Sequence, residues 1–178
     1  VYYEEGFATP YNSDATGGSK GAVAQTTEVV GKKQNVYGYD DAYNKVGDSN
    51  DSVMTLAAGK GAATFTFTGT GVDIYTRSTM ETGSLMIRVM NSANKLVKVV
   101  SVNTVMKNGS SDSTSGQEVT AYNVPVVSLS GLTHGTYTLQ IAAVKSGSAG
   151  AKDVYIDGFR VHGTLEDQSN SVYVADQE

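Results

Sequence analysis

The chain has 178 residues, with 18 acidic and 13 basic side chains, and no cluster of Lys or Arg offsets its formal net charge of −5. Nucleic acids and anionic membranes recruit clustered basic residues, so neither is expected as a partner. The absence of Cys excludes disulfides and thiolate metal sites. No apolar run approaches the roughly 18 residues of a membrane span, so we expect no membrane insertion.

Short segments of alternating apolar and polar residues follow one another along the chain, with glycine-rich turns between them. In Ala63–Thr68, for example, Phe65 and Phe67 point one way, and the intervening threonines point the other way. The predicted strands are, in chain order, Val1–Glu4, Ala24–Val30, Ser52–Ala58, Ala63–Thr68, Val72–Arg77, Ser84–Asn91, Lys95–Asn103, Glu118–Leu129, Thr136–Val144 and Asp153–His162.

Three local signals refine this pattern. Ser84–Asn91 and Lys95–Asn103 flank a short polar turn and predict a β-hairpin. Pro125 predicts an edge strand or a bulge, because proline lacks an amide hydrogen for the ladder. In the last strand the apolar phase shifts at Gly158, which predicts a bulge at Asp157–Gly158.

This spacing of strands and turns predicts an all-β protein, a two-sheet antiparallel β-sandwich with no helix longer than a turn or two. We expect residues 1–163 to form one module and residues 164–178, which are acidic and without Lys or Arg, to form a linker towards a following domain. The polar loop Lys107–Gly116 and the residues after Glu166 are expected to be mobile. The predicted core contains Phe65, Phe67, Ile74, Leu85, Ile87, Leu139, Ile141, Ile156 and Phe159.

No arrangement of residues in the sequence is typical of an active site. The two histidines, His134 and His162, fit neither a Ser–His–Asp nor a Cys–His pair nor paired-histidine metal spacing. Both are expected to be structural or on the surface. Close carboxylate pairs arise by chance among 18 acids, so we expect a binding module and not an enzyme.

Three segments carry turn and strand motifs in a characteristic order. They are Phe65–Tyr75 (FTFTGTGVDIY), in which a strand ends at a Gly-Thr-Gly turn, Gly131–Leu139 (GLTHGTYTL), in which a strand follows a turn with a His-Gly pair, and Val154–Val161 (VYIDGFRV), in which the last strand carries an Ile-Asp-X-Phe-X-Val motif. Together these segments resemble the jelly-roll fold of galactose-binding-like β-sandwiches, which is shared by many carbohydrate-binding modules.

The resemblance implies glycan recognition by a monomeric module of a larger protein, secreted or attached to the cell wall of a Gram-positive gut bacterium of the Firmicutes. Such surface proteins also include host-protein binders of adhesin or immunoglobulin-binding, superantigen-like type, which is the alternative function. A structural spacer is the third. The missing Cys agrees with a surface protein that folds without disulfides.

The galactose-binding-like modules that the chain resembles often hold one structural Ca²⁺ between an acidic first strand and an Asp of the last strand. Glu4, Glu5 and Asp157 match those positions, and backbone carbonyls and water would complete the six to eight oxygen ligands of the ion. A second acidic group comprises Asp40, Asp41, Asp48 and Asp51. Acidic loops are also commonly solvated without an ion.

The ligand candidates form two sets. Tyr37, Tyr39 and Tyr43 lie beside Asp40 and Asp41, and tyrosine faces stack on sugars while carboxylates accept hydrogen bonds from hydroxyl groups. The same tyrosines alternatively cap one end of the sandwich.

Arg77 and Arg88 lie on the polar phases of their strands, where they line a concave sheet face or are simply solvated. Two other strand faces suit contact with a protein. One is a ladder of Thr64, Thr66 and Thr68, and the other surrounds Arg88 with Met86 and Met90. The alternative for the two methionines is a position that faces the core.

Overall fold

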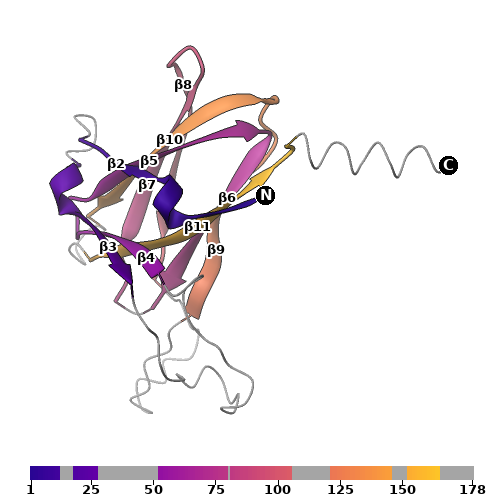
Figure 1. The fold of residues 1–178 in the computed structure, drawn as a ribbon. Coiled ribbons are helices and arrows are strands. Elements are labelled where there is room, and N and C mark those ends of the chain that lie inside the picture. Colours follow the sequence, from indigo (N-terminus) through magenta and orange to yellow (C-terminus); the bar gives the residue numbers. More distant parts are fainter. Residues whose placement is uncertain (13–17, 28–51, 80, 106–120, 146–151, 165–178) are drawn as a thin grey trace, which may run out of the picture.

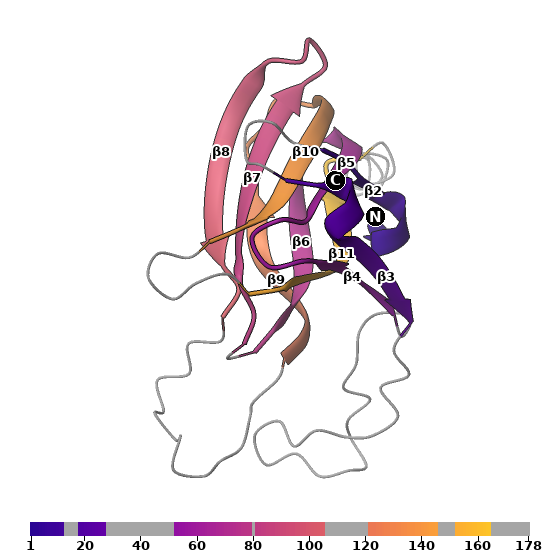
Figure 2. The same cartoon turned by 90° about the vertical axis from the view of Figure 1, so that its left-hand side faces the viewer.

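The computed structural model describes residues 1–12, 18–27, 52–79, 81–105, 121–145 and 152–164. Its strands form two antiparallel sheets that pack on each other (Figures 1 and 2). The predicted all-β sandwich is therefore confirmed. The predicted mobile loop at 107–116 and the residues after 164 lie outside the described part of the chain, so the expected mobility and the linker stay predictions.

We name the sheets after their central strands. The strands of the β11 sheet are β1 (Tyr2–Glu4), β3 (Val23–Thr27), β4 (Ser52–Leu56), β6 (Gly71–Ser78), β9 (Ala121–Leu129) and β11 (Val154–His162). Their order is β3-β4-β11-β6-β9, and β1 also pairs with β11. The strands of the β10 sheet are β2 (Thr9–Pro10), β5 (Ala62–Gly69), β7 (Ser84–Asn91), β8 (Leu96–Asn103) and β10 (Gly135–Val144). Their order is β2-β5-β10-β7-β8.

Two three-residue 3₁₀ turns, η1 (Glu5–Phe7) and η2 (Lys20–Ala22), complete the elements of the described residues. Neither of them, nor any other described segment, is a helix of the length and apolar character that crossing a membrane requires.

The local signals of the sequence are confirmed. β7 and β8 form the predicted hairpin. Pro125 lies in β9, an edge strand, at a point where the pairing with β6 is irregular. The register of β11 against β6 shifts between Ile156 and Gly158, so Asp157 is the extra residue of a bulge. Because the bulge restores the alternation, both Ile156 and Phe159 face the core.

The first strand lies beside the last strand, as Figure 1 shows. One side of β11 is shared by two partners in tandem, since β4 pairs with Val154–Ile156 and β1 pairs with Gly158–Arg160. Asp157 falls at the junction of the two partners. The chain leaves β1 at that junction and enters η1, so the end of β1 and the start of η1 meet the bulge.

The core fills the space between the sheets, and all nine residues predicted for it are buried. Its centre is a pair of parallel rings, Phe65 of the β10 sheet and Phe159 of the β11 sheet, with centroids 3.9 Å apart. Phe67 stacks in turn on Tyr137, whose hydroxyl donates a hydrogen bond to the Thr133 carbonyl at 2.6 Å. The Phe65–Phe159 contact joins the two layers through apolar burial, whereas Phe67 and Tyr137 are paired neighbours within the β10 sheet.

Two of the glycines that close packing requires bear on the arrangement of the sheets. The turn Gly69–Gly71 carries the chain from β5 in one sheet to β6 in the other, and a Cβ at Gly71 would overlap the Leu129 carbonyl oxygen. A Cβ at Gly158 would overlap the Tyr2 hydroxyl and the Tyr3 carbonyl oxygen. Gly158 therefore lets β1 lie against the bulge of β11.

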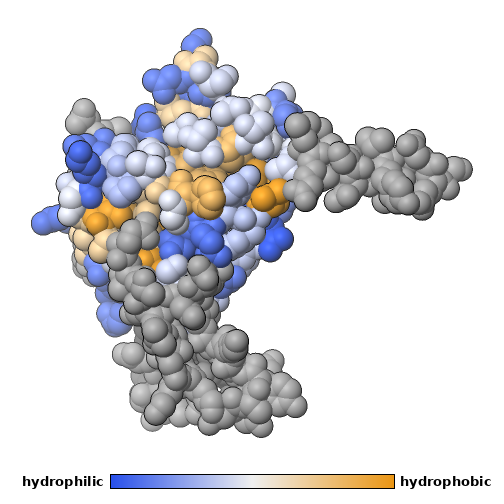
Figure 3. All heavy atoms as spheres, in the orientation of Figure 1, coloured by the Kyte–Doolittle hydropathy of each residue, from blue (hydrophilic) through white to orange (hydrophobic). Residues whose placement is uncertain are grey.

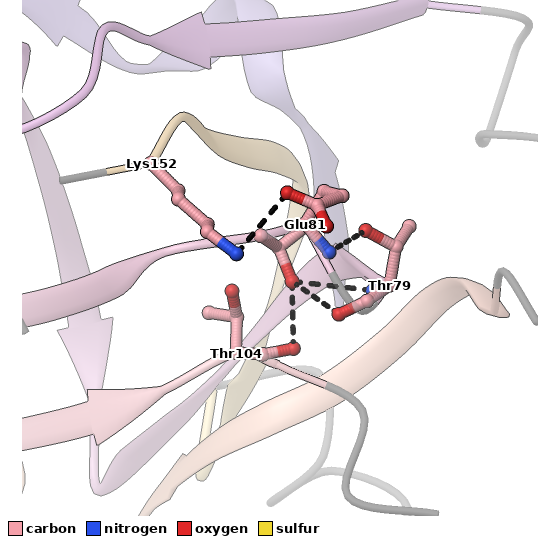
Figure 4. A network of polar contacts seen from close by, with 5 residues as sticks. Thr79, Glu81, Thr104 and Lys152 are labelled. Carbon is pink, nitrogen blue, oxygen red and sulfur yellow. Dashed lines mark hydrogen bonds and ion pairs between the residues drawn. The ribbon is translucent and has the colours of Figure 1, made fainter. Parts of the chain in front are cut away.

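A network of threonines fixes the connection between β6 and β7 (Figure 4). The Thr82 hydroxyl donates to the carbonyls of Thr79 (3.1 Å) and Thr104 (3.0 Å), and the Glu81 amide donates to the Thr79 hydroxyl at 2.9 Å. Lys152 forms an ion pair with Glu81 at 3.1 Å. The ends of β6, β8 and β11 are thereby held together by side chains that satisfy otherwise unpaired backbone groups.

The surface on the side seen in Figure 1 is mixed, with apolar residues in its centre between hydrophilic ones (Figure 3). Among the described residues, Val1 and Phe7 are exposed apolar side chains near the N-terminus, and Leu96, Val97 and Val99 are exposed on the edge strand β8. Scattered apolar side chains are normal on soluble domains, but several on one edge strand are not.

Candidate functional site

The structure brings together the three acidic residues Glu4, Glu5 and Asp157. One carboxylate oxygen of each lies within 4.8 Å of the other two. The tandem pairing of β4 and β1 with β11 produces this cluster, because the end of β1, the start of η1 and the bulge meet at one point. Glu5 is 3% exposed and Asp157 is fully buried.

The hydrogen bonds of this acidic cluster leave one buried oxygen of Glu5 unused. Ser52 donates to Glu5 Oε1, and Asn123 Nδ2 donates to Asp157 Oδ2 at 2.8 Å. Glu5 Oε2 is buried and has no hydrogen-bond partner, and Glu5 forms no ion pair with the described residues. Burial raises the pKa of the Glu5 carboxyl and Glu4 adds to this, while the Ser52 hydrogen bond lowers it. An all-oxygen donor set with an unsatisfied buried carboxylate oxygen fits a hard cation such as Ca²⁺.

A second group, which we call the Tyr–Arg surface, consists of Tyr2, Tyr75 and Arg160 on the outer face of the β11 sheet. The guanidinium carbon of Arg160 lies 5.9 Å from the ring centroid of Tyr2 and 5.8 Å from that of Tyr75. Arg160 Nε donates to the Tyr75 hydroxyl at 3.1 Å. The two rings meet edge to face, with centroids 5.4 Å apart. This is an aromatic platform with a cation fixed on it.

Register explains why these residues meet. Tyr2 of β1 and Asp73 of β6 are both paired with Arg160 of β11, on opposite sides of it, and Tyr75 is paired with Gly158. All four side chains lie on the face opposite to the core, since the alternate residues Ile74, Phe159 and Val161 are buried. Gly158 has no side chain, which leaves room for the tyrosine rings.

A polar group borders the Tyr–Arg surface. His162 Nε2 lies 2.8 Å from Asp73 Oδ2, and the Ser128 hydroxyl donates to Asp73 Oδ1 at 2.7 Å. The His162 side chain is 46% exposed, against 14% for Asp73. His162 is thus on the surface, as expected, but it belongs to an ordered polar group. Hydroxyl, imidazole and guanidinium groups beside tyrosine rings offer both stacking and hydrogen bonding to a ligand.

The two predicted arginines lie on different sheets and do not share one face. Arg77 of β6 is buried, with its guanidinium carbon 5.2 Å from the Tyr122 ring centroid and 4.6 Å from that of Tyr155, so it is not a solvated strand arginine. Arg88 of β7 is half-buried on the β10 sheet, and its Nε atom has no hydrogen-bond partner among the described residues. A ligand role for either arginine stays a prediction.

Several predicted ligand or metal residues lie outside the described part of the chain. They are Tyr37, Tyr39, Asp40, Asp41, Tyr43, Asp48 and Asp51. Their roles also stay predictions.

On the β10 sheet the predicted threonine ladder is present. Thr66 and Thr68 share hydrogen bonds with Thr138 and Thr136, at 3.0 and 2.8 Å, and the Thr64 hydroxyl donates to the Thr9 carbonyl at 3.3 Å. All three hydroxyls thus have partners on neighbouring strands, so the ladder has a structural explanation. Met90 is buried and Met86 half-buried, which agrees more with packing than with an exposed methionine surface.

Sequence reasoning did not single out Tyr2, Tyr75, Asp73 or Arg160 as a site. The sequence did show that Asp73 and Tyr75 share the polar face of one predicted strand, and that Arg160 and His162 share the polar face of another. That signal became a site only through the pairing of β6 and β1 with β11, which alternation in one strand does not reveal.

No protein-family model matches the chain, and no curated protein matches it. Solved structures of similar fold include the exo-β-1,3-galactanase of Phanerochaete chrysosporium, with 12% identity, a TM-score of 0.42, and coverage of 89% of this chain and 28% of that one.

Two further structures are of the same kind. The Agl-KA catalytic domain gives 16% identity, a TM-score of 0.48 and coverage of 92% and 27%. A cycloisomaltooligosaccharide glucanotransferase of Paenibacillus sp. gives 14% identity and a TM-score of 0.40, and the match covers 90% of this chain and 18% of that one. The chain therefore spans less than a third of the length of these three structures. Similarity of this degree concerns the arrangement of strands alone.

Proposed function

We propose that this domain is a non-catalytic glycan-binding module of a larger extracellular protein, either secreted or attached to the cell wall. The observation that supports this is the Tyr–Arg surface with its polar border. Tyrosine rings stack on the C–H faces of sugars, and the surrounding Asp73, His162 and Arg160 offer hydrogen bonds to ring hydroxyls and substituents. The predicted segment Tyr37–Tyr43 is a second place of contact in this proposal, and the Gram-positive gut origin stays a prediction.

The test is a glycan array followed by calorimetry on the best ligand with the variant Tyr75→Ala. Loss of a central aromatic contact is expected to weaken binding about tenfold or more. Phe7→Ala is the matched control. It removes an aromatic ring that is 65% exposed and contacts Tyr3, whose side chain points away from that of Tyr2. Unchanged affinity in Tyr75→Ala together with a loss in Tyr39→Ala would move the site to the predicted segment.

We also propose that Glu4, Glu5 and Asp157 hold one structural Ca²⁺. The unsatisfied Oε2 atom of Glu5 and the proximity of three carboxylates support this. The ion would neutralise carboxylates that repel one another and would tie β1 and η1 to the bulge of β11. It would thus also fix Tyr2, which adjoins this acidic cluster because Asn123 Nδ2 donates to both the Tyr2 hydroxyl (2.9 Å) and Asp157 (2.8 Å).

A second candidate function is the binding of a host protein. The observation that favours it is the edge strand β8, on which Leu96, Val97 and Val99 are 44%, 46% and 48% exposed. Exposed apolar edge strands pair with extended peptides. An immunoglobulin pull-down with the variant Val99→Lys tests this function, and capture that Val99→Lys abolishes supports it. Lys98 on the same strand disfavours pairing between two copies, so we propose a monomeric module.

A further inference from the structure

Arg160 forms no ion pair with a carboxylate of the described residues, and Asp73 across the strands acts on its charge only at longer range. Within that part of the chain its polar contact is the hydrogen bond from Nε to the Tyr75 hydroxyl, and no ion pair is formed. Asp73, its neighbour across the strands, is already engaged by His162 and Ser128. Among the described residues, the two terminal nitrogens of Arg160 therefore have no carboxylate partner and are exposed to a ligand.

The guanidinium is also held in place. Its position over the rings of Tyr2 and Tyr75 and its bond to Tyr75 restrict the side chain before any ligand arrives. Arginine has five N–H donors, and Nε uses its single one, so about four donors on the two terminal nitrogens remain. Paired terminal donors match the two oxygens of a carboxylate or sulfate, and a group already fixed loses little entropy on binding.

We propose that the Tyr–Arg surface selects acidic glycans, in which a sugar carries a carboxylate or a sulfate that pairs with Arg160. This proposal rests on the glycan-binding function proposed above and names its substrate class. The sugar ring lies on the tyrosines, its anionic group meets the terminal nitrogens of Arg160, and its hydroxyls meet His162 and Ser128. Because the chain as a whole is negatively charged, its overall field does not attract anions, and recognition of the acidic group depends on the local contact with Arg160.

The test begins with an array in which each acidic saccharide stands beside its uncharged counterpart, with carboxylated and sulfated sugars as separate arms. The best pair is then titrated by calorimetry with about 2 mM Ca²⁺ present, which keeps the state of the acidic cluster constant. Wild type is expected to bind the acidic member about tenfold or more tightly than the neutral one. The arm that binds identifies carboxylate or sulfate as the anion.

Arg160→Gln removes the charge and keeps much of the side-chain length. It is expected to reduce the affinity for the acidic saccharide to that for the neutral one, while binding of the neutral saccharide persists. Lys60→Gln, which removes a positive charge from the exposed turn between β4 and β5, is the matched control and is expected to keep the preference. Circular dichroism of both variants verifies folding.

The outcomes separate the two proposals. Equal affinity of wild type for acidic and neutral saccharides, or a preference that survives Arg160→Gln, overturns selection by Arg160 and leaves glycan binding intact. Absence of binding to every saccharide overturns both. Binding of acidic peptides with the same dependence on Arg160, and of no saccharide, would reassign the surface to a protein partner and likewise overturn both.

Discussion

The effect of the acidic cluster on the stability of the fold is expected to change sign when a cation binds. Two unit charges 4.8 Å apart repel by roughly 3.5 kcal/mol at an effective dielectric constant near 20. Without a cation the folded state therefore bears a cost whenever all three carboxylates are ionised. Glu5→Gln removes one charge and keeps an oxygen that accepts the Ser52 hydrogen bond. In EDTA this variant is expected to be at least as stable as wild type.

With Ca²⁺ the order is expected to reverse. An ion that binds only the folded state stabilises it by about 2.7 kcal/mol at a hundredfold excess over Kd. For a domain of this size that raises Tm by about 5–10 °C. Glu5→Gln removes a charged ligand and is expected to lose most of this rise.

The assay is thermal unfolding of wild type, Glu5→Gln and Glu81→Gln in EDTA and in excess Ca²⁺. Glu81 is 71% exposed and is paired with Lys152, and it is not a member of the acidic cluster, so its variant is expected to respond to the ion as wild type does. Identical melting curves of wild type with and without Ca²⁺ would refute the reasoning. So would a Glu5→Gln variant that gains as much stability from the ion as wild type.

Three further predictions concern stability. Phe159→Ala removes a fully buried ring stacked on a second phenylalanine and is expected to lower the free energy of unfolding in urea by about 4 kcal/mol. The control Phe7→Ala, at a 65% exposed ring, should change that free energy by less than about 0.5 kcal/mol. Equal effects of the two substitutions would contradict the assigned core. Gly158→Ala forces Tyr2 away from β11 and is expected to lower both Tm and glycan affinity, and a variant with unchanged Tm would show that β1 does not pack as described. In EDTA the raised pKa of Glu5 gives a stability contribution that is present below pH 4.5, the ordinary pKa of a glutamate, and is lost as pH rises through the folded-state pKa. The unfolding free energy of wild type, relative to that of Glu5→Gln, should therefore fall over that pH interval. A difference between the two proteins that does not change with pH would contradict the burial of the carboxyl.

The alternation of residues determined much of the fold by itself. Phe65 and Phe67 against their threonines, and Leu85 and Ile87 against Met86 and Arg88, indicated strands and core, because one face of each strand must leave water. The phase shift at Gly158 even located the bulge, since Ile156 and Phe159 both have to reach the core. Strand β2 could not be predicted, because two residues give no alternation.

The arrangement of sites depended on pairing between distant strands. The proximity of Glu4, Glu5 and Asp157 was expected from resemblance alone, and it is explained by the tandem pairing of β4 and β1 along one side of β11. Alternation shows which face a side chain joins, but it does not give the neighbouring strand or its register. Arg77 and Arg160 both lie on polar phases of strands, yet one is buried between tyrosines and the other is exposed on them. That difference arises from strand order and from the missing side chain of Gly158, which tertiary structure alone decides.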